Sequence, residues 1–366
     1  MSETDRLSLR HPDGTTTIYI GNHVLEATRG AVTRWVEGRR MFVISTPRVL
    51  SLHGEALDSL LSAAQAREVL VVPEGEEAKC LEVAGSLWTE ILTRGGKRDS
   101  RLIAFGGGSV GDLGGFVAGC FLRGIEYLQM PTTLLAQVDA ALGGKTAIDC
   151  GGAKNSVGLF HHPAMVISEA SFLSTLPKEE IRAALAEVIK MAALLDPLLL
   201  ERLEGRLPEL LKGDPESLAP VVLAAARAKV RVVQRDPGEA GERRLLNFGH
   251  TLGHALEAAA VDGSLRHGDA VAYGMLFALR LALNRGLEEA VAGRLEELIQ
   301  GLGLPPLPTY DIDVLMALMQ KDKKNQETGL VWVLPESVGQ GKMFDDVEPD
   351  EVRDLLPAFL EHPWTA

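Results

Sequence analysis

Three histidines and one glutamate in the second half of the chain have the types and spacing of a metal centre. His250 and His254 are four residues apart in a segment with helical periodicity, so their side chains share one helix face. His267 begins the next predicted helix, and Glu187 lies in an apolar part of the predicted helix 178–195. One carboxylate and two imidazoles with open positions form the donor set of a catalytic zinc ion. We therefore predict a divalent cation held by Glu187 and two of these histidines.

Each of these residues taken alone has a simpler interpretation. A helical glutamate is usually solvated, and a histidine pair is usually satisfied by hydrogen bonds. An unpaired carboxylate on an apolar helix face is costly, however, and a cation is one way to satisfy it. The sequence HTLGH at 250–254 has no glutamate between its histidines, so it does not match the HExxH pattern of metalloproteases.

Two glycine-rich segments in the first half predict phosphate binding. The sequence FGGGSVGDLGG at 105–115 follows an apolar run and precedes a predicted helix, whose free N–H groups and positive dipole end attract anions. It is not a GxGxxG fingerprint, and a tight turn needed only for packing is the alternative. Further on, Asp139, Lys145, Lys154 and Asn155 lie among glycines, which suits a phosphate- or hydroxyl-bearing ligand. Capping of the next helix is the alternative role of Thr132 and Thr133.

More cations and polar groups accompany the histidines. They are Arg123, Lys190, Lys229, Arg243, Asn247 and the run DKKN at 322–325. Most lysines and arginines are solvated surface groups, which is the alternative for each. Arg243, Asn247, His250 and His254 nevertheless follow one face of a predicted helix, 243–260, and this predicts a surface that binds phosphate and carboxylate.

The elements that must position these residues change character along the chain. Short apolar runs alternate with helical or glycine-rich segments in the first half, at 41–45, 68–72, 102–105, 126–130 and 164–167. That alternation predicts an α/β domain at residues 1–170 with a largely parallel, Rossmann-like sheet. Segments rich in Ala, Leu, Glu and Arg follow at 178–195, 197–211, 216–235, 243–260 and 267–285. They predict an all-α metal-binding domain at 171–366, with a short strand or hairpin near 329–334.

The overall composition narrows the class of partner. The 366 residues carry a net charge of −13 and only 5% aromatic side chains, which argues against nucleic acid. An anionic ligand must then be met by cations gathered locally. The three cysteines match no disulfide framework or metal spacing. Neither a secretory leader nor a long apolar run is evident, so we expect a cytoplasmic protein with no membrane partner.

Several of these segments together resemble the 3-dehydroquinate synthase family of sugar-phosphate cyclases. In chain order they are GGGSVGDLGGF at 106–116, RG at 123–124, PTTLLAQVDAALGGKTAID at 131–149, KN at 154–155, LAEVIK at 185–190, RRLLNFGHTLGHALEA at 243–258, RHGDAVAYGM at 266–275 and DKKN at 322–325. The resemblance implies a homodimer that uses NAD+ and one divalent metal, Zn2+ or Co2+.

The resemblance also implies a role for individual residues. The metal ligands would be Glu187, His250 and His267. Contacts to NAD+ would come from Glu76, Lys79, Gly107, Gly108, Ser109, Asp112, Thr132, Thr133, Leu135, Asp139, Lys145, Lys154, Thr175 and Glu180. Substrate contacts and catalytic groups would be Arg123, Asp139, Lys145, Asn155, Lys190, Lys229, Arg243, Asn247, His254 and Lys323.

The reaction implied by the resemblance belongs to the shikimate pathway of aromatic amino-acid biosynthesis. A small anionic sugar phosphate, 3-deoxy-D-arabino-heptulosonate 7-phosphate, would be converted to 3-dehydroquinate and phosphate. The implied steps are transient oxidation by NAD+, phosphate elimination, re-reduction and an intramolecular aldol closure. The alternatives are a cyclase of the inosose or valiolone type, a metal-dependent polyol dehydrogenase, and a homologue that binds ligands without catalysis.

Overall fold

The computed structural model describes residues 4–62, 66–260, 263–324 and 331–364. The chain divides into two compact units. The first, here called the sheet unit, comprises residues 1–177 with 213–237; the second, the helical unit, comprises 178–212 with 238–366. The division of the sequence at residue 170 stays a prediction. These units differ from it because residues 213–237 group with the sheet.

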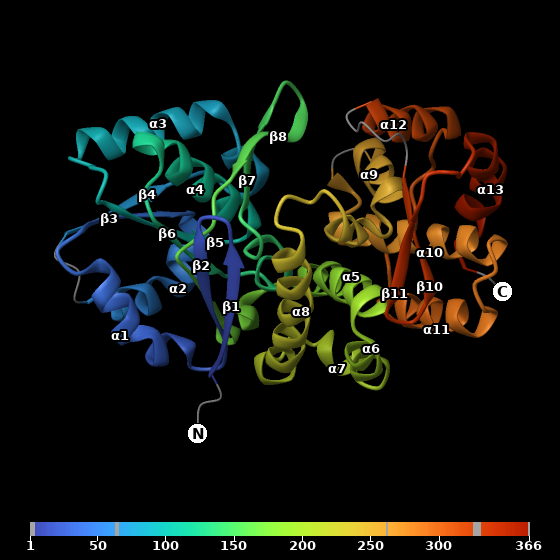
Figure 1. Cartoon of the computed structure of the whole chain (residues 1–366), viewed down its shortest axis with the longest axis horizontal. Helices are drawn as coiled ribbons and strands as arrows, with labels where there is room; N and C mark the ends of the chain where they lie inside the picture. The colour runs from blue at the N-terminus through green and yellow to red at the C-terminus, as the bar shows by residue number, and fades with distance from the viewer. Residues whose placement is uncertain (1–3, 63–65, 261–262, 325–330, 365–366) are drawn as a thin grey trace. The chain divides into compact units, whose positions relative to one another are not determined.

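The sheet unit is built on one largely parallel sheet (Figure 1). Its strands in spatial order are β1 (Thr4–His11), β2 (Gly14–Gly21), β9 (Met165–Glu169), β6 (Tyr127–Pro131), β5 (Arg101–Gly106), β3 (Arg40–Ser45) and β4 (Ala66–Val71). Every neighbouring pair is parallel except β1 and β2, which form an antiparallel edge hairpin. The five strand positions expected from the sequence are confirmed as β3, β4, β5, β6 and β9.

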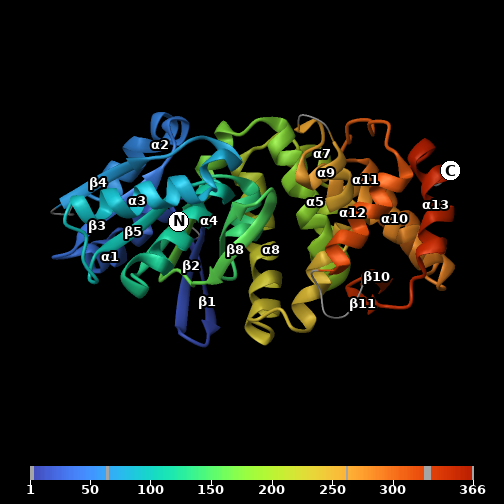
Figure 2. The same ribbon diagram turned by 90° about the horizontal axis from the view of Figure 1, so that it is seen from above.

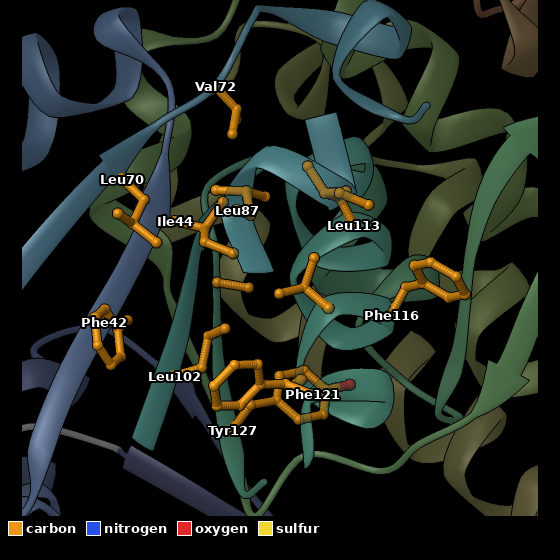
Figure 3. Close-up of a cluster of buried hydrophobic side chains, with 14 of the residues drawn as sticks. Phe42, Ile44, Leu70, Val72, Leu87, Leu102, Leu113, Phe116, Phe121 and Tyr127 are labelled. Carbon is orange, nitrogen blue, oxygen red and sulfur yellow. The ribbon is translucent and has the colours of Figure 1, made fainter. Parts of the chain in front are cut away.

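Helices cover both faces of this sheet. One apolar cluster joins α3 (Leu81–Thr93) and α4 (Gly108–Cys120) to the strands, and its buried side chains include Leu87 of α3, Leu113 of α4 and Phe42, Leu102 and Tyr127 of the strands (Figure 3). A second cluster on the opposite face includes side chains of α1 (Val24–Val36) and α2 (Pro47–Leu60). The alternation of buried positions along each strand supplies both clusters, which makes the sheet a rigid base for the loops at its ends.

Three further elements of the sheet unit surround the glycine-rich loops. The hairpin of β7 (Lys145–Cys150) and β8 (Ala153–Phe160) packs against α4, as Figure 2 also shows. A π-helical turn, η3 (Ala136–Ala140), follows β6. Helix α8 (Pro215–Arg235) packs on η3 and on the β1–β2 hairpin, which explains why it groups with the sheet.

The helical unit consists mainly of helices around a central one, α10 (His267–Asn284). Helices α5 (Lys178–Leu195), α9 (His250–Ala259) and α11 (Glu289–Gln300) all contact α10 (Figure 1). The remaining elements are α6 (Pro197–Glu204), α7 (Leu207–Leu210), α12 (Ile312–Lys324), α13 (Pro349–Glu361) and the hairpin of β10 (Trp332–Ser337) and β11 (Gln340–Phe344). The hairpin confirms the strand signal expected near 329–334, although 329 and 330 lie outside the described residues.

Two helix predictions in this unit were wrong in extent. The segment 197–211 is broken into α6 and α7, because the chain turns at Gly205 and Arg206. The segment 243–260 is a short 3-10 helix, η5 (Glu242–Asn247), followed by α9. Gly249 separates them with a φ of 80°, a left-handed conformation that glycine adopts without strain. The predicted single face carrying both Arg243 and His254 therefore does not exist.

Among the described residues, no helix combines the length and the apolar character needed to cross a bilayer.

Candidate metal and nucleotide sites

Glu187, His250 and His267 converge in the helical unit from three different helices. The Nε2 atoms of His250 and His267 each lie 3.6 Å from Oε1 of Glu187. One ligand atom from each of the three residues can be chosen so that all lie within 4.8 Å of one another. That spacing admits a single cation among them, since Zn–N and Zn–O bonds are about 2.0–2.2 Å long.

The surroundings of the Glu187 carboxylate suit a metal ligand. The side chain is 1% exposed, and neither carboxylate oxygen has a hydrogen-bond partner among the described residues. Burial opposes its ionisation, but Lys190, His250 and His267 hold the pKa of Glu187 well below its usual value. Lys190, itself buried, forms an ion pair with it. A buried, ionised carboxylate that has one ion pair and no hydrogen bond among the described residues fits a divalent cation.

The second nitrogen of each histidine ring is already bonded. His250 Nδ1 lies 3.2 Å from the carbonyl oxygen of Phe248, and His267 Nδ1 lies 2.8 Å from Oε2 of Glu257. If each Nδ1 donates its proton to that acceptor, the lone pair of Nε2 is free to bind a metal. Burial and nearby Lys190 hold the pKa of His250 well below its usual value, which favours the neutral ligand form. Burial lowers the pKa of His267, but Glu187 and Glu257 outweigh it and raise that pKa to about 9, so a cation must displace a proton from this ring.

Close helix packing fixes the relative positions of the three ligands. A Cβ added to Gly268 would lie 1.9 Å from the carbonyl oxygen of Ala183 on α5. A Cβ added to Gly274 would lie 1.9 Å from the carbonyl oxygen of Gly249, just before α9. Only glycine permits such a backbone approach. The glycines of α10 thus bring α5 and α9 close enough for their side chains to meet.

In the sheet unit, a buried lysine connects three of the predicted binding segments. Lys79 Nζ lies 3.0 Å from Oδ2 of Asp112 at the start of α4 and 2.5 Å from Oδ1 of Asn155 in β8. Glu76 is 3.4 Å from the same ammonium and accepts a 2.9 Å hydrogen bond from Ser109. Burial opposes the charge on Lys79, but Asp112 and Glu76 outweigh it and raise the pKa of Lys79. Burial raises the pKa of Asp112 to about 6 despite Lys79.

A second lysine in the sheet unit binds the π-helical turn. Lys229 Nζ on α8 donates to both the backbone carbonyl oxygen and Oδ1 of Asp139, each at 2.6 Å. Gln137, fully buried in the same turn, donates to the carbonyl oxygens of Pro131 and Glu169. π-Helical turns often occur at functional sites, and this one fixes the Asp139 carboxylate beside a cation.

The glycine-rich loop has the geometry expected of an anion site. Gly107 is the N-cap of α4, so the free N–H groups of its first turn follow directly after β5. The N–H of Thr132 donates to the carbonyl oxygen of Gly106, which joins the ends of β5 and β6. A Cβ on Gly107 would lie 3.1 Å from the methyl group of Thr133. The two predicted phosphate segments therefore lie side by side.

Two family models together cover most of the chain. The model of the 3-dehydroquinate synthase N-terminal part matches residues 69–183, and that of the C-terminal part matches residues 184–325. The chain belongs to the 3-dehydroquinate synthase family. A 3-dehydroquinate synthase from Xylella fastidiosa (strain M23) is 41% identical to it over an alignment of 352 residues that covers 93% of this chain and 95% of that protein.

Solved structures of related cyclases share the fold. A 2-epi-5-epi-valiolone synthase from Streptomyces hygroscopicus subsp. jinggangensis 5008, with NAD+ and Zn2+ bound, superposes with a TM-score of 0.86 at 29% identity, covering 94% of this chain and 97% of that one. A 2-deoxy-scyllo-inosose synthase complexed with carbaglucose-6-phosphate, NAD+ and Co2+ gives 0.88 at 25% identity, covering 97% and 99%. The α/β fold with a helical second part is thereby confirmed for the family.

The other predicted site residues occupy several kinds of position. Lys145 begins β7, Lys154 lies in β8, and Arg123 follows α4 with a φ of 70°. In the helical unit Arg243 is buried in η5, Asn247 ends that turn, and His254 is exposed on α9 with its ring 5.1 Å from that of His250. Thr175 lies 3.0 Å from His53, Glu180 forms an ion pair with Arg266, and Leu135 precedes η3. Lys323 lies in α12, but its side chain is outside the described part of the structure.

Sequence reasoning missed Glu257, the hydrogen-bond partner of His267. A signal was available, because Glu257 is seven residues beyond His250 and three beyond His254 and so lies on the same face of α9.

Proposed function

We propose that the chain converts 3-deoxy-D-arabino-heptulosonate 7-phosphate to 3-dehydroquinate and phosphate, using NAD+ and one divalent metal, Zn2+ or Co2+. The observation that carries the proposal is the convergence of Glu187, His250 and His267, in a chain that both family models match. The metal would be held by these three residues. When bound, the metal supplies Lewis-acid polarisation of a substrate oxygen, and NAD+ supplies a reversible hydride acceptor.

Most of the nucleotide contacts belong to the sheet unit in this proposal, and one of them, Glu180, belongs to the helical unit. The N-terminus of α4 at Gly107 and Gly108 would bind the pyrophosphate, with the Thr132–Thr133 turn beside it. Glu76, Lys79, Ser109 and Asp112 already form one hydrogen-bonded group and would contact the rest of the nucleotide. The remaining nucleotide contacts are Leu135, Asp139, Lys145, Lys154, Thr175 and Glu180.

The substrate groups are anionic and require local cations, since the chain as a whole carries a charge of −13. Lys190 beside Glu187 and the buried Arg243 supply positive charge in the helical unit. Lys229, held by Asp139, supplies it in the sheet unit. Arg123, Lys145, Asn155, Asn247 and Lys323 complete the proposed substrate contacts. Each fixes the position of a phosphate, carboxylate or hydroxyl group.

Proton transfer in this proposal falls to His254. Its ring is exposed and lies 5.1 Å from the His250 ring and 5.8 Å from the His267 ring, measured between centroids. It therefore stands beside the metal ligands without being one of the three. An exposed imidazole there can take a proton from a substrate hydroxyl and return it to solvent.

Related cyclases of the inosose and valiolone type are the second candidate. The lower identity of their structures, 25% and 29% against 41% for the 3-dehydroquinate synthase, supports the first candidate. A polyol dehydrogenase would leave NADH as a product and has no need of the phosphate-binding cations. The proposal also includes a homodimer in the cytoplasm, acting on a small-molecule substrate without nucleic acid or membrane partners.

The test uses the full chain loaded with Zn2+ and a catalytic amount of NAD+. We expect phosphate release from the heptulosonate phosphate in many turnovers per NAD+, with no lasting rise in absorbance at 340 nm. Glucose 6-phosphate should release none. Accumulation of one NADH per turnover would instead identify a dehydrogenase, and phosphate release from glucose 6-phosphate alone would identify an inosose-type cyclase.

A further inference from the structure

A partly buried ion pair joins the two helices that carry Glu187 and His267. Arg182 on α5 donates from Nε to Oδ1 of Asp269 and from Nη2 to Oδ2, both at 2.9 Å. Asp269 is 1% exposed and Arg182 19%. The hydrogen bonds to Asp269 raise the pKa of Arg182 above its usual value even though burial opposes this. Two parallel bonds between planar groups fix orientation as well as distance.

The pair lies close to two of the proposed metal ligands. Asp269 is two residues beyond His267 in the first turn of α10, and Arg182 is five residues before Glu187 on α5. Between them, Gly268 meets the backbone of Ala183. At a rise of about 1.5 Å per residue, the pair is about 3 Å along α10 from one ligand and about 7.5 Å along α5 from the other.

We propose that the Arg182–Asp269 pair is a positioning device for the metal site, which sets the separation and relative rotation of Glu187 and His267. This rests on the proposed metal role of those two residues. The side chains of Arg182 and Asp269 bond each other rather than a ligand atom, so the effect passes through the helix backbones. A planar fork at the start of α10 restrains rotation of that helix about its axis, which a contact between apolar side chains would not.

The pair should contribute more to fixing the geometry of the site than to the stability of the fold. Desolvating both charges offsets much of their attraction, whereas removing one partner leaves a buried charge uncompensated. Its geometric effect should therefore be visible in conservative variants that keep either the charge or the shape of the side chain. Arg182→Lys keeps the positive charge but loses the fork, and Asp269→Asn keeps the shape but loses the charge.

The experiment measures zinc affinity of the metal-stripped full chain by competition with a chromophoric chelator. We expect Arg182→Lys and Asp269→Asn each to raise the dissociation constant for Zn2+ about 10- to 100-fold, the range found for groups that orient metal ligands. The Zn2+ dissociation constant of the Arg182→Lys/Asp269→Asn double variant should be no higher than that of the weaker-binding single variant, because the two residues act as one unit. The visible d–d spectrum of the Co2+ form should change in energy and intensity in the variants.

A matched control lies at the other end of α10. Arg285 and Glu351 form a second two-point pair, at 2.6 and 2.8 Å, that joins the end of α10 to α13. Arg285→Lys should lower the melting temperature of the metal-free chain, while the Zn2+ dissociation constant and the Co2+ spectrum stay as in the unsubstituted protein. Circular dichroism confirms that each variant is folded.

Two results would overturn the inference, and a third would contradict the proposed function instead. If Arg182→Lys and Asp269→Asn lower thermal stability but leave Zn2+ affinity and the Co2+ spectrum unchanged, the pair only stabilises the fold. If Arg285→Lys weakens Zn2+ binding as much as Arg182→Lys does, position beside the ligands is irrelevant. If the unsubstituted chain itself binds no Zn2+, the metal role of Glu187 and His267 is wrong.

Discussion

For Glu187, the sequence predicted the burial of the side chain but not all of its partners. Its place among apolar residues of a helix predicted a buried carboxylate, and the structure confirms that it is buried, with oxygens that have no hydrogen-bond partner among the described residues. The i, i+4 spacing likewise placed His250 and His254 on one face. Which two histidines accompany the glutamate could not be derived from spacing, because α10 and α9 come together only through tertiary packing.

Glu187→Gln tests the ligand set at this scale. The amide keeps the size of the side chain but removes the negative charge, so a divalent cation loses its only anionic ligand in the triad. We expect the bound zinc measured by mass spectrometry to fall from one per chain to none, and phosphate release to stop. His250→Ala should do the same. Full activity in either variant would end the metal assignment.

Glu257→Gln tests the hydrogen bond behind His267. An amide accepts more weakly than a carboxylate, and the ring would be less firmly oriented. We expect about 10- to 100-fold weaker Zn2+ binding, measured by chelator competition. Glu296→Gln on α11 is a control of the same chemistry on a neighbouring helix, for which affinity should not change. Unchanged affinity in Glu257→Gln would show that this hydrogen bond has no influence on the metal.

At the scale of elements, the helix boundaries predicted from the sequence were most accurate where the helical periodicity was uninterrupted. The sequence placed α5, α8 and α10 nearly to the residue, because their apolar stripes are long and bounded by Pro or Gly. It failed at Phe248–Gly249, where a helical pattern continues through a break in the backbone. The hydrophobic pattern does not predict that Gly249 lies against α10, because this close contact arises only when the two helices pack together.

Gly274→Ala tests the close packing of α10 against the start of α9. The new methyl group would lie 1.9 Å from a carbonyl oxygen, so the helices must separate. We expect the free energy of unfolding to fall by about 3 kcal/mol and Zn2+ affinity to fall with it. Gly293→Ala on α11 meets nothing within 4 Å and should stabilise by about 0.5–1 kcal/mol. Equal effects of the two substitutions in chemical denaturation would contradict this account of the packing.

Lys79→Met tests the network that joins α4 to the β7–β8 hairpin. Without the ammonium, Asp112 keeps the burial that raises its pKa and loses the charge that lowers it. We expect the free energy of unfolding to fall by about 1–3 kcal/mol at pH 8, where the partly buried carboxylate is ionised without its ion-pair partner. Because the folded-state pKa of Asp112 is raised, the folded state binds its proton more tightly, so this loss shrinks as the pH falls through that pKa.

Denaturation of Lys79→Met at pH 8 and pH 5.5 measures this difference. A loss of stability that grows toward low pH would contradict the role assigned to Asp112. Hydrogen exchange in the hairpin, residues 145–160, should also be faster in the variant, because Lys79 Nζ no longer binds Asn155.

At the scale of the whole molecule, alternation of strands and helices predicted the parallel sheet, and the change in texture after residue 169 predicted the helical part. The β1–β2 edge and the β7–β8 hairpin were not anticipated. Strand β8 is exposed along nearly all of its length, so it carries no apolar alternation to recognise. The sequence also does not predict that α8 belongs to the sheet unit, because the apolar face of a helix does not specify the surface against which it packs.

Metal removal tests how far the site contributes to the stability of the whole protein. A ligand that binds only the folded state stabilises it by about 4 kcal/mol at a free concentration 1,000 times its dissociation constant. We expect a chelator to lower the melting temperature, and added Zn2+ to restore it. Glu187→Gln should melt at the same temperature with and without the chelator; a chelator effect of full size in that variant would point to metal bound elsewhere.

The most direct measurement of the central claim is anomalous X-ray diffraction at the zinc edge from crystals of the full chain. We predict one strong peak bonded to Glu187 and to the Nε2 atoms of His250 and His267, at about 2.0–2.2 Å. That peak should be missing from crystals of Glu187→Gln. A peak at other residues, or none in crystals of an active, zinc-containing preparation, would contradict the account.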